Sequence, residues 1–246
     1  FIGVNAGLNN TIGTGGTYIG AYSGATNTTG INNTFIGQLS GYSNSTGDSN
    51  TFNGAYSGYL NTTGYGNSFT GLSSGFSNTT GFYNSFFGLS AGALNTTGDS
   101  NSFVGASSGH NNTTGINNSY LGLNAGFTNA TGSSNVIFGT LSGYSNLNGS
   151  NNTFIGTQSA SGTIFAKMDN NTTIGFQSGL RLATSTGNIL LGYQTAQNLT
   201  TGSFNIGLGY NVDFASSTGS NQLNIGNLLF GNNIDANRDQ NLYLPR

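Results

Sequence analysis

The stretch NTFIGQLSGYSNSTGDS at residues 33–49 is followed directly by NTFNGAYSGYLNTTGYG, NSFTGLSSGFSNTTGFY and NSFFGLSAGALNTTGDS, which end at residue 100. We number the positions of this unit from 0 to 16, with Asn33 at position 0. The glycine at position 4 recurs every 17 residues from Gly3 to Gly156 without an insertion. A fixed short period of this kind predicts a solenoid.

Each unit contains one short strand signal. Positions 0 to 4 read Asn-Thr-Phe-Ile-Gly, an aromatic and β-branched run that ends at glycine. Further glycines at positions 8 and 14 are suited to turns, and no segment has the helical period of 3.6 residues. The predicted fold class is therefore all-β, a parallel β-solenoid (β-roll) of about 14 coils.

The repeat divides the chain into three parts. Residues 1–160 are predicted to form regular coils, residues 161–231 irregular coils, and residues 232–246 an exit segment or linker. In the irregular part we expect position 4 at Gly175, Gly192, Gly207 and Gly226, with spacings of 19, 17, 15 and 19 counted from Gly156. Because the chain starts at Phe1 without a methionine, we expect a processed or excised piece.

Two neighbouring columns of the strand are apolar. Position 2 is aromatic or Ile in every unit from Phe1 to Phe154, and position 3 is apolar in most units from Ile2 to Ile155. Adjacent strand residues point to opposite faces, so one column fills the coil and the other needs a partner outside it. We therefore expect a homo-oligomeric rod; the alternative is a monomeric solenoid with exposed aromatic rings.

Asparagine recurs at position 0 and at position 11. Identical amides at identical corners can hydrogen-bond from coil to coil, which predicts stacked ladders. The position-0 residues are Asn33, Asn50, Asn67, Asn84, Asn101, Asn118, Asn135, Asn152, Asn171 and Asn188.

Composition excludes several classes of function. Only 4% of the residues are charged, and four Lys and Arg residues cannot supply the basic surface that nucleic acids require. The absence of Cys excludes disulfides and thiolate zinc sites, and most coils lack the Asp that calcium-binding repeats need. No apolar run approaches the roughly 20 residues of a membrane span. We expect no cofactor, no metal, and no membrane insertion in this segment.

The chemistry of catalysis is sparse as well. The single histidine, His110, stands at position 9, where other units carry Tyr or Phe, so we interpret it as a substitute ring. Asp48 and Asp99 share position 15 but lie three coils apart, too far for paired carboxylates. Like charges in successive coils would repel, which explains why charges are rare. The chain is predicted not to be an enzyme.

Three repeating features are candidate binding surfaces. The first is a pair of threonines at positions 12 and 13, either an ice-binding lattice or a turn-stabilising ladder: Thr28, Thr29, Thr62, Thr63, Thr79, Thr80, Thr96, Thr97, Thr113 and Thr114. The second is an aromatic column at position 9, for sugar stacking or for packing: Tyr42, Tyr59, Phe76 and Tyr144. The third is a row of Asn-x-Thr sequons, either glycosylated or part of the ladder: Asn27, Asn44, Asn61, Asn78, Asn95, Asn112 and Asn129.

The units NTFIGQLSGYSNSTG and NNTFIGTQSASG resemble head repeats of trimeric autotransporter adhesins, and TGSFNIGLGYNVDFASSTGSNQLNIGNLLFG is similar to shaft repeats of bacterial and phage fibre proteins. The resemblance implies a homotrimer, an extracellular location on a cell surface or virion fibre, and adhesion, although the adhesin unit is shorter than 17 residues. We therefore expect a structural fibre or adhesin segment that attaches to a cell-surface or polysaccharide ligand. An ice-binding solenoid and a tailspike-like polysaccharide-binding or depolymerising protein are the alternatives.

Overall fold

The computed structural model describes residues 1–163, 166–232 and 241–243. The described residues contain strands and turns but no helix, and they form a parallel β-solenoid of about 12 turns, fewer than the 14 expected. The chain divides into two compact units, Phe1–Asn124 and Ala125–Arg246, which we describe one by one. A helix that could cross a membrane is absent from the described residues.

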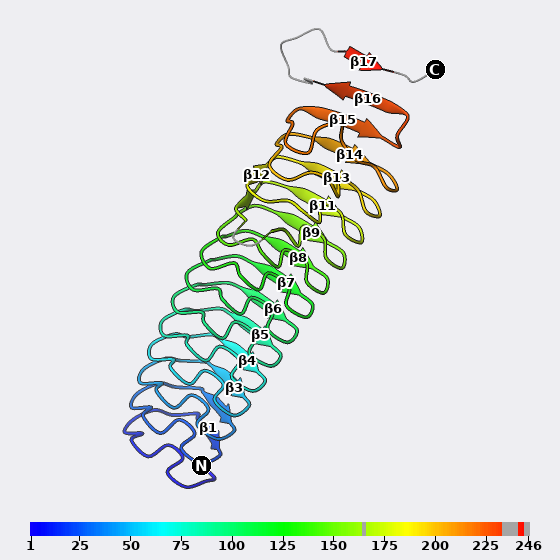
Figure 1. The fold of residues 1–246 in the computed structure, drawn as a ribbon. Helices are drawn as coiled ribbons and strands as arrows, with labels where there is room; N and C mark the ends of the chain where they lie inside the picture. The colour runs from blue at the N-terminus through cyan, green and yellow to red at the C-terminus, as the bar shows by residue number, and fades with distance from the viewer. Residues whose placement is uncertain (164–165, 233–240, 244–246) are drawn as a thin grey trace. The chain divides into compact units, whose positions relative to one another are not determined.

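The first unit is built from three-residue strands that occupy positions 1 to 3 of successive coils. They pair in parallel with the same position of the next coil, for example Phe52 with Phe69, so the register follows the 17-residue repeat directly. Successive strands lie side by side, and the loops between them follow the same path in each coil (Figure 1). The strands are β1 (Thr17–Ile19), β2 (Thr34–Ile36), β3 (Thr51–Asn53), β4 (Ser68–Thr70), β5 (Ser85–Phe87), β6 (Ser102–Val104) and β7 (Ser119–Leu121).

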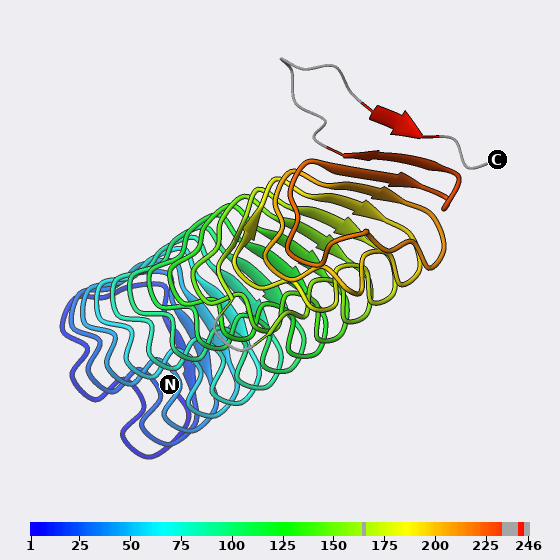
Figure 2. The ribbon, with the colours of Figure 1, turned by 45° about the horizontal axis from the view of Figure 1, so that its top comes forward.

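The second unit continues the same pattern and then changes direction. Its parallel strands are β8 (Val136–Phe138), β9 (Thr153–Ile155), β11 (Thr172–Ile174), β13 (Ile189–Leu191), β14 (Ile206–Leu208) and β15 (Gln222–Ile225). The strands β16 (Leu229–Asn232) and β17 (Asn241–Tyr243) follow with antiparallel pairing, as the reversed arrows in Figure 2 show. A separate parallel pair joins β10 (Met168–Asp169) to β12 (Ser185–Thr186).

The register of the second unit corrects one sequence expectation. Gly207 pairs with Leu190 and therefore occupies position 2, so its assignment to position 4 was wrong. The corner at position 4 is formed by Gly209, with φ of 130°, in the same backbone conformation as Gly192 at 136°. The repeat therefore slips once, by two residues between Gly156 and Gly175, and keeps its spacing of 17 afterwards.

The corner glycines are required by the distance between coils. Gly71 has φ of 131°, which side chains with a Cβ rarely adopt. A Cβ on Gly71 would also collide with the carbonyl group of Gly88 in the next coil. The corner therefore needs glycine for its conformation and for its close backbone approach.

The column at position 2 is the core of the regular coils. Phe35, Phe52, Phe69, Phe86 and Phe103 are fully buried, and neighbouring rings are stacked with centroids 4.7 to 4.9 Å apart. Position 7 is small because its side chain lies against the strand of the next coil. Where it is serine, its hydroxyl group can donate a hydrogen bond to a backbone carbonyl there, as Ser23 does to Phe35 at 2.8 Å. Burial of the rings shows that position 2 points into the coil.

The core of the second unit changes its chemistry after Phe154. Leu182 and Leu199 stand at position 11 in place of asparagine, and both are fully buried. Gly207 leaves space at position 2, and the ring of Phe214 reaches that space from a later loop. Aliphatic packing thus replaces part of the aromatic column and part of the amide ladder in the same coils.

The predicted asparagine ladders are confirmed. At position 11, Nδ2 of Asn44 donates to Oδ1 of Asn27 at 2.7 Å and to the carbonyl of Gly47 at 3.0 Å. At position 0, Oδ1 of Asn33 accepts the backbone N–H of Asn50 at 2.9 Å, so this second ladder joins side chain to backbone. Both ladders are buried, and they satisfy polar groups that would otherwise be costly to enclose.

Candidate binding surfaces

The outer face of the sheet carries apolar side chains at position 3. The apolar side chains that strands β1 to β7 carry there are between 36% and 48% exposed: Ile19, Ile36, Phe87, Val104 and Leu121. Asn53 and Thr70 interrupt the column without disturbing the pairing of β3 with β4. Contiguous exposed apolar surface of this kind commonly marks an interaction site. We call this surface the outer sheet face.

The threonine pair separates into two different environments. At position 12 the hydroxyl groups of Thr28, Thr62, Thr79 and Thr96 each donate to the backbone carbonyl of the next coil, at 3.0 Å. These side chains are half-buried and stabilise the turn. At position 13 the side chains point to solvent, and we call them the threonine row: Thr29, Thr46, Thr63, Thr80, Thr97 and Thr114.

The aromatic column at position 9 is half-buried. Tyr42, Tyr59 and Phe76 stack with centroids 5.4 and 5.1 Å apart, and in the second unit Phe127 stacks on Tyr144 at 5.3 Å. Ala93 interrupts the column after Phe76. The ring faces are therefore largely occupied by one another, which limits them as a platform for a ligand.

His110 lies in the same column position. Its Nδ1 is 2.7 Å from Oδ1 of the neighbouring Asn111. This contact gives the ring an amide neighbour.

The sequon asparagines are buried. All seven have no exposed surface, and in six of them Nδ2 is a donor to the glycine carbonyl three residues later. A glycan must be attached at this same Nδ2 atom. A glycan on a folded coil would therefore have to displace the ladder at these positions: Asn27, Asn44, Asn61, Asn78, Asn95, Asn112 and Asn129.

The aspartates at position 15 have a structural role that the sequence did not reveal. Oδ1 of Asp48 accepts the backbone N–H of Ile31 at 2.8 Å, and Oδ1 of Asp99 accepts that of Phe82 at 2.9 Å. In the second unit Asp169 does the same for Ser150 at 2.8 Å. Serine at this position acts in the same way, since Oγ of Ser203 accepts from Thr186 at 3.1 Å. Each side chain satisfies a turn N–H of the preceding coil.

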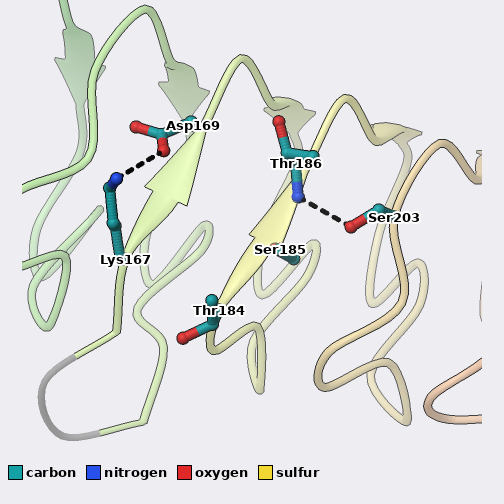
Figure 3. A pocket seen from close by; sticks show the side chains of 6 residues that line it. All are labelled: Lys167, Asp169, Thr184, Ser185, Thr186 and Ser203. Carbon is teal, nitrogen blue, oxygen red and sulfur yellow. Dashed lines mark hydrogen bonds and ion pairs between the residues drawn. The ribbon is translucent and has the colours of Figure 1, made fainter.

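A shallow hollow of about 210 Å³ lies beside β10 and β12 (Figure 3). It is lined by Lys167, Asp169, Thr184, Ser185, Thr186 and Ser203. The ammonium group of Lys167 pairs with Asp169 at 3.4 Å, and the carboxylate also holds the N–H of Ser150. The charged groups are therefore engaged with the protein itself. Among residues 1–163, 166–232 and 241–243, no three His, Cys, Asp or Glu side chains are grouped so that they could hold a metal ion.

A different surface occurs in the second unit, directly after the ends of β11, β13 and β14. Phe176, Tyr193 and Tyr210 stand at position 5 and stack with centroids 5.3 and 5.1 Å apart. They are 40%, 43% and 69% exposed. The sequence did not indicate this stack. With Gly207 assigned to position 4, position 5 falls on Leu208, whereas in the structure it falls on Tyr210.

Comparison with known proteins gives no family for this chain. No family model matches it, and neither the curated proteins nor the solved structures contain a significant match. What the chain does must therefore be argued from its own surfaces.

Proposed function

We propose that this chain is an extracellular structural segment of a fibre or adhesin, on a cell surface or a virion, that assembles with further copies of itself. Three copies are favoured, because the repeats resemble those of trimeric adhesins. The chain acts by reach and attachment, without catalysis. Stacked coils supply a stiff support, and repeated side chains on their outside sum weak contacts through multivalency.

The observation that carries this proposal is the outer sheet face. Phe87, Val104 and Leu121 occupy consecutive coils, and each points away from the core. Complete burial of a large, exposed apolar side chain contributes about 1.5–3 kcal/mol, so covering these half-exposed side chains gains part of that amount in each coil. A copy of the same chain has the same repeat distance, so its own column matches this one coil by coil.

Light scattering coupled to size exclusion tests the assembly. The unaltered chain is expected to have about three times the 25.1 kDa mass of a single chain. The triple variant Phe87→Thr, Val104→Thr and Leu121→Thr is expected to elute as a single chain. Thr70 already occupies this position in β4, so threonine is compatible with the strand.

The matched control changes exposed leucines away from the sheet. Leu60 and Leu94 stand at position 10 and are 36% and 42% exposed. The variant Leu60→Thr and Leu94→Thr should keep the mass of the unaltered chain. A mass of 25.1 kDa for the unaltered chain would contradict the proposal.

A second function, ice binding, is supported by the threonine row. Six successive coils of the first unit present one exposed threonine each. Thermal hysteresis that is abolished by Thr80→Lys and Thr97→Lys, but kept in Thr51→Lys, would favour this function over attachment. An absence of thermal hysteresis in the unaltered chain would exclude it.

The non-catalytic part of the proposal is tested on polysaccharide. We expect no release of reducing sugar when the assembled protein is incubated with capsular polysaccharide. Release that persists after repurification would favour a tailspike-like depolymerase instead.

A further inference from the structure

The position-5 stack differs in kind from the rest of its column. In the first unit this position carries Leu72, Leu89 and Leu123 and, in the other coils, Val, Ala or Gln, whereas three successive coils of the second unit carry Phe176, Tyr193 and Tyr210. Tyrosine combines an apolar ring with a polar hydroxyl group, which suits a surface that is wet when free and covered when bound. Position 5 therefore presents an aliphatic surface in the first unit and an aromatic surface with hydroxyl groups in these coils of the second unit.

The residues next to the stack form a glutamine ladder. Nε2 of Gln177 donates to Oε1 of Gln158 at 2.7 Å, and Nε2 of Gln194 donates to Oε1 of Gln177 at 2.8 Å. Gln197 adds a fourth amide, whose Nε2 lies 3.3 Å from Oε1 of Gln177. Position 6 of the first unit holds no glutamine, and a ring at position 5 is followed by a glutamine at position 6 in two successive coils of the second unit, at Phe176–Gln177 and Tyr193–Gln194.

The ladder is held in place before any ligand arrives. Each amide is fixed by a neighbour one coil away, and an amide carries two donor hydrogens and two acceptor lone pairs. Gln177 donates once and accepts twice, so one donor hydrogen remains on its half-exposed side chain. Gln194 donates once to Gln177, so a second donor hydrogen and the acceptor oxygen remain on its half-exposed side chain. Groups that are fixed in advance lose less entropy on binding.

Tyr210 is the open end of the stack. Tyr193 covers one face of its ring, with interplanar angle 9°, and Tyr210 is nevertheless 69% exposed. The next residue at this position, Asn227, has no ring to continue the stack. One aromatic face is thus available for a flat apolar group.

We propose that the strip formed by Phe176, Tyr193, Tyr210 and the flanking glutamines binds a neutral polysaccharide, with one sugar ring on the open face of Tyr210 and neighbouring hydroxyl groups on the tyrosine and glutamine side chains. Sugars combine apolar C–H faces with hydroxyl groups, as the strip combines rings with amides. The strip itself contains no charged residue, which favours a neutral glycan over an anionic one. This inference rests on the proposed attachment function and names its ligand.

Affinity electrophoresis tests the site in the complete chain. Native gels contain dextran, galactomannan or hydroxyethyl cellulose as neutral probes, and alginate as the anionic comparison; the net charge of −2 allows the protein to migrate. Retardation is expected in at least one neutral gel. Tyr210→Ala should weaken it about tenfold, and Tyr210→Phe should keep it within about threefold.

The control is an exposed tyrosine outside the strip. Tyr22 is 41% exposed in the first unit, and Tyr22→Ala should leave retardation unchanged. The proposal is overturned by the absence of retardation in all neutral gels, by equal retardation of Tyr210→Ala, or by stronger retardation in alginate.

Light scattering on the same variants separates this site from the assembly. Tyr210→Ala should retain the mass of the unaltered chain. A fall in mass without a change in retardation would assign the strip to the contact between copies and overturn glycan binding. Loss of retardation at unchanged mass leaves the fibre proposal intact.

Discussion

Nδ2 of Asn61 lies 2.7 Å from Oδ1 of Asn44, one coil earlier in the chain. The same Nδ2 donates to the carbonyl of Gly64 at 2.9 Å, and Oδ1 of Asn61 accepts from Asn78 at 2.8 Å. One buried side chain therefore satisfies three polar groups that no water reaches. The ladder makes neighbouring coils depend on each other through their interiors as well as through their strands.

The variant Asn61→Ala is expected to destabilise the fold by about 3 kcal/mol or more, because it leaves the amides of Asn44 and Asn78 and the carbonyl of Gly64 without this partner. Urea unfolding followed by circular dichroism measures the loss. Thr63→Ala, an exposed change in the same coil, should alter stability by less than about 0.5 kcal/mol. Equal stability of the two variants would contradict the role of the ladder.

The corner glycines allow a graded comparison. Gly71→Ala should cost about 3 kcal/mol or more, because it combines a positive φ with a collision against Gly88. Gly226 has φ of 60° and no atom within 4 Å of an added Cβ, so Gly226→Ala should cost about 1–2 kcal/mol. Thermal unfolding of both variants checks the order, and a larger loss for Gly226→Ala would show that spacing between coils is not the cause.

Tyr18 predicts an alkaline dependence of stability. Burial raises the pKa of its phenol above the ordinary 10.0, and the amides of Asn27 and Asn33 oppose this rise more weakly. A raised folded pKa means that the contribution to stability is complete below about pH 10 and is lost as the pH increases through the folded value.

Substitution of Tyr18 isolates that dependence. The hydroxyl group is buried without a hydrogen bond of normal geometry, and most of the regular coils have Phe at this position, so Tyr18→Phe should fold with equal or greater stability. The difference in urea midpoint between Tyr18→Phe and the unaltered chain should grow above pH 10. Tyr22→Phe, an exposed change, should show no such growth.

Removal of one whole coil tests the repeat itself. Deletion of residues 67–83 joins Gly66 to Asn84 in the same phase, so the chain should fold with the same spectrum per residue and a modest loss of stability. Deletion of residues 75–83 removes about half a coil and puts every later side chain out of register. That variant should fail to give a cooperative unfolding transition, and its normal folding would refute the 17-residue coil as the structural unit.

Much of the architecture could be predicted from the printed repeat. Phe69 and Asn78 recur at fixed spacing, and a column of identical residues implies that identical environments are stacked. The second unit was harder to predict. Gly207 and Gly209 both fit a corner in the sequence, and only the pairing of Gly207 with Leu190 decides between them. A uniform repeat determines which position of the coil each residue occupies. Where two glycines lie close together, either of them can be assigned to the corner.

The candidate surfaces also combine features that the sequence predicted with features that only the structure decided. The sequence placed Thr79 and Thr80 together, and the structure separates a hydroxyl that holds the next turn from one that points to solvent. The sequence also placed Asn61 in a sequon, and its burial determines that it belongs to the ladder. Neighbouring residues in a turn differ in direction, which periodicity does not specify.

The sequence by itself determined the strand, its parallel register in the regular coils and the content of the core, because a 17-residue period repeats each local choice until neighbouring coils must agree. Only the tertiary structure decided which atoms are accessible. The rings of Tyr193 and Tyr210 form an exposed stack because the phase of their coils brings position 5 into line, and that alignment depends on how the chain absorbs its two extra residues.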